Sequence, residues 1–324
     1  MFKQITKSFV YRVAYLVGYH TQLLAKIKKN KFVPILSLHR VSPEKNLFWP
    51  PLHPYILDEL LSFLKKHFEI VTFHELIDAV YKKPKLILSF DDGYYDFIEY
   101  AMPILKKHNI KANQNIIPSQ LLGENPLWNI LFYDFLNAAP LSLIKEIRFL
   151  DFDANKLVEK KVSKTVIGLA VSRALKKIAT QERNCILKNL HETIFSKLIS
   201  YPQTRMIRLH EIKDVITEHE IGVHSFSHDS MENESIEYFI EDFHKCKNFF
   251  KEHNFPKMDI YAFPNGSYRD EHISYLQKNG IQHILLVNDQ YAKHSSPYER
   301  LNIAAYDRVE AIFQALGIKS TCPK

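Results

Sequence analysis

The sequence has few of the residues that build disulfide frameworks and no long apolar run. Its three cysteines, Cys185, Cys246 and Cys322, lie far apart and form no Cys-x-x-Cys pair. An odd number of isolated cysteines argues against a disulfide framework and favours a reducing compartment. The most apolar stretch near the start, residues 9–19, is interrupted by Arg12 and is too short to cross a bilayer. No small-residue cleavage site follows this stretch, so we expect no secretory signal peptide.

Runs of basic residues interleaved with aromatics, which are typical of nucleic-acid-binding proteins, are also lacking. We therefore expect no nucleic-acid partner. The chain of 324 residues has 43 Lys and Arg against 36 Asp and Glu, a formal net charge of +7. Such a surplus is an ordinary feature of basic proteins, and it would equally favour an anionic surface such as a membrane or an acidic glycan.

Residues 1–31 have the pattern of an amphipathic helix with a basic end. The basic residues at this end are Lys26, Lys28, Lys29 and Lys31. Two alternatives stay open: the helix packs on the body of the protein, or it lies on a membrane surface. We predict a cytoplasmic protein, with peripheral contact to the inner membrane through this helix as the second alternative.

Apolar, strand-like runs alternate with helical patterns along most of the chain. The predicted strands cover residues 32–39, 70–71, 86–90, 110–117, 219–224, 258–263, 281–287 and 301–305. The predicted helices cover residues 57–68, 72–82, 96–108 with a kink at Pro103, 206–217, 235–253, 269–278 and 308–316. Repeated strand–helix units predict an α/β fold, a distorted (β/α) barrel of about seven parallel strands covered by helices.

The segment at about 119–205 differs from the rest of the chain. It contains three long amphipathic patterns, at 127–138, 157–178 and 182–199, and few strand signals. We interpret it as a helical insertion that interrupts a barrel domain of residues 32–324.

Unusual polar residues follow the predicted strands at several places. Asp91 and Asp92 end an apolar run, and His224 and His228 follow another strand. In barrels of this type the active site lies at the carboxyl ends of the strands. Adjacent buried carboxylates repel each other and lose hydration, which raises the pKa of at least one of them unless a cation is present. The alternative is an ordinary Asp-Asp-Gly turn.

The histidine pair strengthens the interpretation of a metal site. Two imidazoles and one carboxylate are a ligand set that suits Zn²⁺ or another divalent metal used in hydrolysis. The sequence has only eight glycines, and Gly93, Gly222 and Gly266 lie in or beside the strand-end motifs, which favours tight turns there. A pair of surface or core histidines is the simpler alternative.

Three ordered motifs, Ser89–Gly93, His224–His228 and Phe263–Gly266, resemble those of the polysaccharide deacetylase (NodB-homology) family, which is carbohydrate esterase family four. The resemblance covers roughly residues 33–118 and 206–310. It implies a distorted (β/α) barrel that removes acetyl groups from N-acetylated sugars with a divalent metal, for which Zn²⁺ fits best.

The resemblance also implies a role for each residue of the motifs. Asp91 corresponds to the general base, and Asp92, His224 and His228 correspond to the metal ligands. The turn formed by Pro264 and Asn265 corresponds to a part of the substrate groove, and we include Arg300 among the expected substrate-binding residues.

The general acid is implied by a second, narrower likeness. The segment Leu36–Val41 resembles the opening strand of the branch that acts on poly-N-acetylglucosamine exopolysaccharides, in which a histidine at the position of His39 is the acid. The late leucine-x-histidine motif of the family is not evident, and His283 is the nearest alternative to His39.

Three positions depart from the family pattern, one of which is Asn265, where an aromatic residue commonly follows the turn proline. The arginine that often precedes the proline turn is absent, which puts the orientation of Asp91 in doubt; Arg300 and Arg40 are the candidates to replace it. Asp229 stands where a proline usually follows the second histidine.

The leading hypothesis is a metal-dependent hydrolase that removes N-acetyl groups from N-acetylhexosamine units of a surface polysaccharide or its precursor. One alternative is a non-catalytic carbohydrate-binding protein on the same barrel. Another is a deacetylase of a different small amide.

Overall fold

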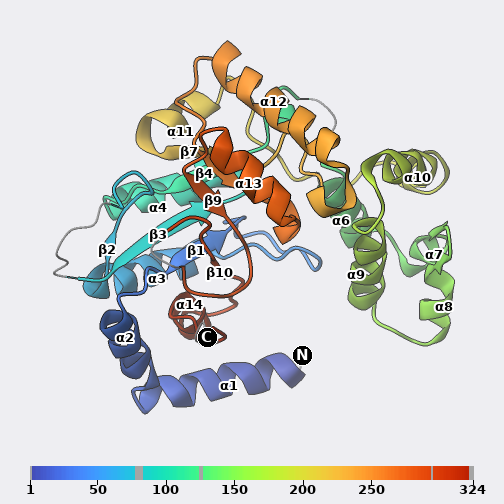
Figure 1. The fold of residues 1–324 in the computed structure, drawn as a ribbon. Coiled ribbons are helices and arrows are strands. Elements are labelled where there is room, and N and C mark those ends of the chain that lie inside the picture. Colours follow the sequence, from blue (N-terminus) through green and yellow to red (C-terminus); the bar gives the residue numbers. More distant parts are fainter. Residues whose placement is uncertain (1, 77–82, 124–126, 293–294, 321–324) are drawn as a thin grey trace.

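Short parallel strands form a curled central sheet in the computed structural model, which describes residues 2–76, 83–123, 127–292 and 295–320 (Figure 1). The strands are β1 (Ile35–Leu38), β2 (Glu69–Ile70), β3 (Lys85–Phe90), β4 (Asn113–Ile116), β7 (Glu220–Val223), β8 (Ile260–Ala262), β9 (His283–Leu285) and β10 (Leu301–Asn302). Their order is β10-β1-β3-β4-β7-β8-β9, and β2 pairs with β3 outside this path. The predicted fold class, a distorted (β/α) barrel of about seven parallel strands, is confirmed.

Helices surround this sheet (Figure 1). They are α3 (Pro54–His67), α4 (Met102–Lys107), α11 (Ile212–Glu218), α12 (Ile236–Glu252), α13 (Asp270–Lys278) and α14 (Arg308–Ala315). The predicted irregularity at Pro103 takes the form of a π-helical turn, η1 (Phe97–Ala101), directly before α4. The backbone N–H of Thr72 donates to the Glu75 carboxylate over 3.0 Å, as a capping box requires, but most of the helix predicted to follow, residues 77–82, lies outside the described residues.

The strands are buried on both faces, which explains why the sequence shows apolar runs there instead of alternation. All six residues of β3 are buried. A close approach by the neighbouring strand explains the glycine at position 222, because a Cβ there would lie 2.1 Å from Oδ1 of Asn115 on β4. Parallel pairing sets Leu38 opposite Phe90, so the residues that follow β1 and β3 emerge side by side at one edge of the sheet.

The segment between α5 (Pro118–Leu121) and α11 is mainly helical and forms a hydrophobic cluster of its own. It contains α6 (Trp128–Ala138), α7 (Leu141–Ile144), α8 (Ala154–Glu159), α9 (Lys164–Leu175), α10 (Thr180–Thr193) and the 3-10 turn η2 (Phe195–Lys197). The amphipathic pattern over 157–178 is divided between two helices, because a turn at Lys161, with φ 55°, separates α8 from α9. The short antiparallel pair β5 (Arg148–Phe149) and β6 (Phe152–Asp153) was not predicted. The division of the chain into an N-terminal segment of residues 1–31 and a barrel domain of residues 32–324 stays a prediction.

Two helices, rather than the single one expected, occupy the N-terminal region: α1 (Phe2–Leu16) and α2 (Tyr19–Asn30). Gly18 separates them with a left-handed φ of 78°, which ends the first helix. α1 packs on α14, where the rings of Tyr11 and Phe313 lie 5.3 Å apart. Within the described residues, no helix combines the length and the apolar character that a bilayer span needs.

Candidate metal centre and active site

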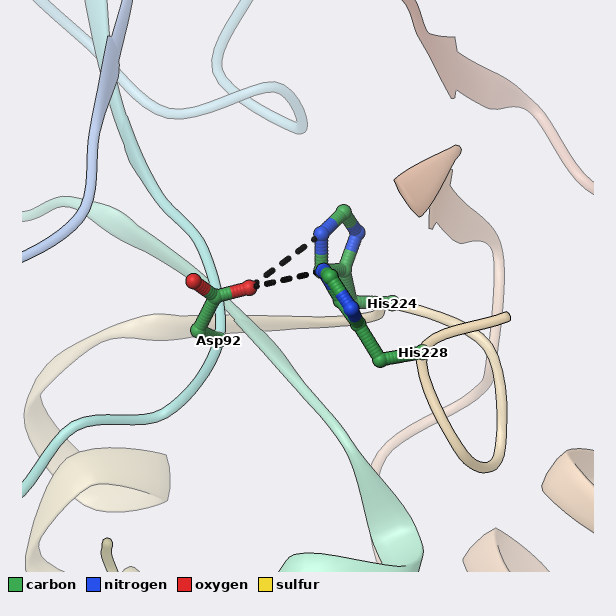
Figure 2. Close-up of side chains that lie close together, drawn as sticks. All are labelled: Asp92, His224 and His228. Atoms are coloured by element: carbon green, nitrogen blue, oxygen red, sulfur yellow. Dashed lines mark ion pairs between the residues drawn. The ribbon is translucent and has the colours of Figure 1, made fainter. Parts of the chain in front are cut away.

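The ends of β3 and β7 bring three of the predicted ligands together (Figure 2). Oδ1 of Asp92 lies 3.4 Å from Nε2 of His224 and 3.3 Å from Nε2 of His228. All three side chains are buried, and their ligand atoms lie within 4.8 Å of one another. Figure 2 shows the carboxylate pointing toward both rings, which is the arrangement that a shared cation requires.

The donor atoms fit a divalent metal. Nδ1 of His224 lies 2.8 Å from the carbonyl oxygen of Ala262, and a carbonyl can only accept, so the proton is on Nδ1 and the lone pair of Nε2 faces Asp92. Burial lowers the pKa of His224 to about 4, so this ring is neutral at pH 7. Oδ1 of Asp92 is buried and has no hydrogen-bond partner among the described residues. A cation between this buried carboxylate oxygen and the unprotonated Nε2 of His224 would be favourable for both groups, and this donor set suits Zn²⁺.

The backbone at this edge of the sheet adopts conformations that L-residues rarely take. Positive φ values occur at Asp92 (74°), Ser225 (55°), His228 (64°) and Asn265 (56°). Such conformations cost of order 1 kcal/mol or more each and cluster at functional sites, where the surrounding packing maintains them. Two of these residues, Asp92 and His228, belong to the cluster of candidate ligands.

Asp91, the predicted base, points instead into the barrel and forms a buried ion pair with Arg300. Nη1 of Arg300 donates to Oδ1 of Asp91 over 2.9 Å, and Nη2 donates to Oδ2 over 2.8 Å. The side-chain amide of Asn115 donates to the same Oδ1 over 2.7 Å. Burial by itself would raise the pKa of Asp91, but the charge and hydrogen bonds of Arg300, together with the charges of His224 and His39, outweigh it and lower the pKa to about 2. Asp91 is therefore ionised throughout the physiological range.

Of the two candidates for the arginine that this chain lacks before its proline turn, Arg300 is the one that contacts Asp91. It stands just before β10, and its Nε donates to the carbonyl oxygen of Leu286 after β9, so its side chain crosses the open seam of the barrel. The side chain has 0% exposed surface, so the predicted contact of Arg300 with substrate does not fit the structure, whereas its alternative role beside Asp91 does. Arg40, the other candidate, pairs with Asp96 over 2.8 Å.

The two candidate acids lie at opposite edges of the sheet. His39 follows β1 next to Asp91, is half-buried, and contributes to lowering the pKa of both Asp91 and Asp92. Its ring meets that of Trp49 edge-on, with 5.1 Å between centroids. His283 is the first residue of β9 and stacks on Tyr298 at the amino-terminal edge. Because His283 lies at the edge away from Asp91, the structure favours His39 as the candidate acid.

The turn after β8 is η4 (Pro264–Gly266), and the insertion contacts it. Pro264 is buried, whereas Asn265 is exposed and accepts a hydrogen bond of 2.7 Å from Nζ of Lys176. Lys176 follows α9; burial lowers its pKa, and the negative charge of nearby Asp92 partly offsets this. No motif in the sequence indicates this lysine, because its position depends on how the insertion packs on the barrel.

Asp229, which departs from the family pattern, holds the insertion against the loop of His228. Its Oδ1 accepts from Nη2 of Arg183 over 2.5 Å and from the hydroxyl of Thr180 over 2.8 Å. The hydroxyl of Tyr238 donates to its other oxygen over 2.8 Å. A proline at position 229 could form none of these contacts. We therefore relate the aspartate at this position to the presence of the insertion.

Comparison with known proteins agrees with this geometry. Residues 194–284, which include both histidines and the Pro264 turn, match the family model described as polysaccharide deacetylase. No curated protein sequence matches the chain.

Several solved structures share the fold at low sequence identity. The Streptococcus pyogenes deacetylase PplD, in complex with acetate, superposes with a TM-score of 0.55 at 16% identity, over 88% of this chain and 98% of that chain. IcaB from Ammonifex degensii gives 0.55 at 15% identity, over 88% and 97%. A de-N-acetylase from Aggregatibacter actinomycetemcomitans gives 0.51 at 15% identity, over 86% and 99%. The chain thus resembles the polysaccharide deacetylase family in the matched segment and in its fold, which confirms the resemblance predicted from its three motifs.

Proposed function

We propose that this protein is a metal-dependent hydrolase that removes N-acetyl groups from N-acetylhexosamine units of a surface polysaccharide or its precursor. The observation that carries the proposal is the buried, unpartnered Oδ1 of Asp92, which faces two imidazoles directly beside the ionised Asp91. The matched family and the shared fold support deacetylation as the reaction class.

Each residue at the edge of the sheet has a chemical task in this proposal. Asp92, His224 and His228 would hold a divalent metal, which supplies a Lewis acid for the acetyl carbonyl and lowers the pKa of a nearby water. Asp91, ionised and held in place by Arg300, accepts a proton from the attacking water. His39 donates a proton to the departing sugar amine, so that the products are acetate and a free amino sugar.

A cavity of about 880 Å³ between the insertion and the barrel supports a glycan substrate. Ser227 and Asp229, which flank the ligand His228, line it on the barrel side. Trp128 and Tyr201 of the insertion line the opposite side. Aromatic faces and polar groups in one groove suit the apolar faces and hydroxyls of pyranose rings. We infer that the chain of sugars extends from the metal ligands into this cavity.

The alternative of a non-catalytic carbohydrate-binding protein rested on the missing arginine and the uncertain acid. Arg300 supplies the partner of Asp91, and His39 lies at the correct edge, so no described contact favours that alternative.

Acetate release from N-acetylglucosamine oligomers tests the proposal. With Zn²⁺ added, we expect wild-type protein to release acetate and His39→Gln to lower kcat about 10²-fold or more, because the leaving amine loses its proton donor. His283→Gln is the matched control, since it removes a half-buried histidine at the other edge, and we expect kcat to stay within about twofold. No acetate from any N-acetylated oligomer or glycan precursor, with metal bound, would contradict the proposed function. Equal losses in both variants would contradict the role of His39.

A further inference from the structure

One side of α1 exposes a continuous apolar surface. The α1 apolar face consists of Phe9, Val10, Val13 and Leu16 of the helix and Val17 directly after it, whose exposed fractions are 67%, 55%, 43%, 84% and 74%. Spacings of three and four residues place them on the same side of the helix. Large exposed apolar patches are rare on a protein surface without a partner and mark interaction sites.

The opposite side of α1 already has its partner. Tyr11 and Tyr15 pack against Phe313 of α14, and the hydroxyl of Ser8 donates to Asp307 over 2.7 Å. The contacts with α14 fix which side of the helix is turned outward. The α1 apolar face is therefore part of the protein surface in this fold, and the side of α1 that belongs to the core is the one that packs on α14.

The surplus of basic over acidic residues is concentrated in the same region. Residues 1–31 contain seven Lys and Arg and no Asp or Glu. Residues 32–324 contain the remaining 36 Lys and Arg and all 36 acidic residues, so their net charge is zero. The formal charge of +7 is thus equal to that of residues 1–31 alone. Lys28 and Lys29, near the end of α2, are exposed. Figure 1 shows α1 and α2 together beside α14, on the other side of the molecule from the insertion.

We propose that the α1 apolar face binds the surface of an anionic lipid bilayer, with the lysines of α2 contacting the headgroups. A helix with an apolar face and a surplus of cations lies in the plane of the interface, with the apolar side chains at the boundary of the acyl chains. Each Lys or Arg near an anionic leaflet raises the affinity of a protein for the membrane about fivefold. A second copy of this chain is a poor occupant, because it would bring an identical positive region against this one.

Co-sedimentation with lipid vesicles tests the proposal, independently of any enzymatic activity. We expect the wild-type chain to bind vesicles of phosphatidylcholine mixed with phosphatidylglycerol, and to bind pure phosphatidylcholine much more weakly. Phe9→Ser with Leu16→Ser should weaken binding at least about 50-fold, because two apolar side chains no longer enter the bilayer. Lys28→Gln with Lys29→Gln should weaken it roughly 30-fold on anionic vesicles only, and high salt should reduce this difference.

Matched controls carry the same chemical changes on the insertion. Leu150→Ser with Ile199→Ser removes two apolar side chains that are at least as exposed as Phe9 and Leu16, and Lys156→Gln with Lys160→Gln removes two exposed charges. Binding within about twofold of wild type is expected for both. Equal binding to neutral and anionic vesicles, no binding to either, or equal losses in the control variants would overturn the proposal. A concentration-dependent dimer that Phe9→Ser with Leu16→Ser abolishes would instead assign the face to a second copy and would also overturn it.

Discussion

Asp91→Asn is expected to lower the rate of acetate release about 10³-fold and to leave metal binding unchanged. Asparagine keeps the shape of aspartate but cannot accept the proton of the attacking water, and general-base catalysis typically contributes about 10²- to 10⁴-fold. Asp91 has both oxygens on Arg300 and is not among the three side chains that meet at Oδ1 of Asp92. The measurement is kcat on N-acetylglucosamine oligomers, with metal content determined on the same sample.

Asp96→Asn is the matched control for this prediction. Asp96 is also a buried carboxylate paired with an arginine, Arg40, but it lies outside the cluster of ligands. Both variants leave an arginine without its counterion and lose stability for that reason. Only Asp91→Asn should lose most of its activity. If both variants lose activity equally at a temperature where both are folded, the loss comes from destabilisation and Asp91 is not the base.

Arg300→Met is expected to lower the free energy of unfolding by about 3–5 kcal/mol. It leaves the carboxylate of Asp91 buried without its partner, and breaking a buried ion pair from one side costs about this much. Asp91→Asn in the same chain should restore part of the loss, because the remaining buried group is then uncharged. Denaturant unfolding of the two single variants and the double variant measures the coupling between the residues.

Arg308→Met provides the comparison for Arg300→Met. Arg308 pairs with Glu59 over 3.4 Å at the surface, where an ion pair contributes at most about 1 kcal/mol. A loss at Arg300 no larger than that at Arg308 would mean that the buried pair is not formed in solution.

The sequence predicts most of the fold and the meeting of Asp92, His224 and His228 at one edge, for a physical reason, whereas the choice of Asp92 over Asp91 as a metal ligand comes from the family resemblance. Strand-forming runs are local signals, and the carboxyl ends of parallel strands meet at one edge, so residues distant in the chain can be placed together without a structure. Asp92, His224 and His228 are the clearest example, since each follows a buried strand or its turn.

The arginine beside Asp91 could not be assigned in the same way. Arg40 and Arg300 both stand near strand ends, and nothing local distinguishes them. Which arginine reaches Asp91 depends on the tertiary structure. The side chain of Arg300 enters the barrel at the seam between β9 and β10, whereas that of Arg40 pairs with Asp96.

Contacts between the insertion and the barrel also could not be predicted from the sequence. Lys176 and Arg183 lie in helical segments that contain no recognisable motif, and their partners Asn265 and Asp229 are distant in the chain. Such pairs follow from how two hydrophobic clusters pack against each other, which periodicity does not encode. The break at Gly18, by contrast, has a local signal, because a glycine within an apolar helical pattern can mark the end of a helix.

Metal binding by the purified chain is the most direct test of the proposed metal centre. After treatment with a chelator, the wild-type protein should take up about one equivalent of Zn²⁺, and calorimetric titration should show affinity at least about 100-fold weaker for His228→Ala. His283→Ala, which removes a histidine at the opposite edge of the sheet, should bind like the wild type. A wild-type protein that binds no divalent metal, or a His228→Ala variant that binds as tightly as the wild type, would contradict the assignment of Asp92, His224 and His228 as its ligands.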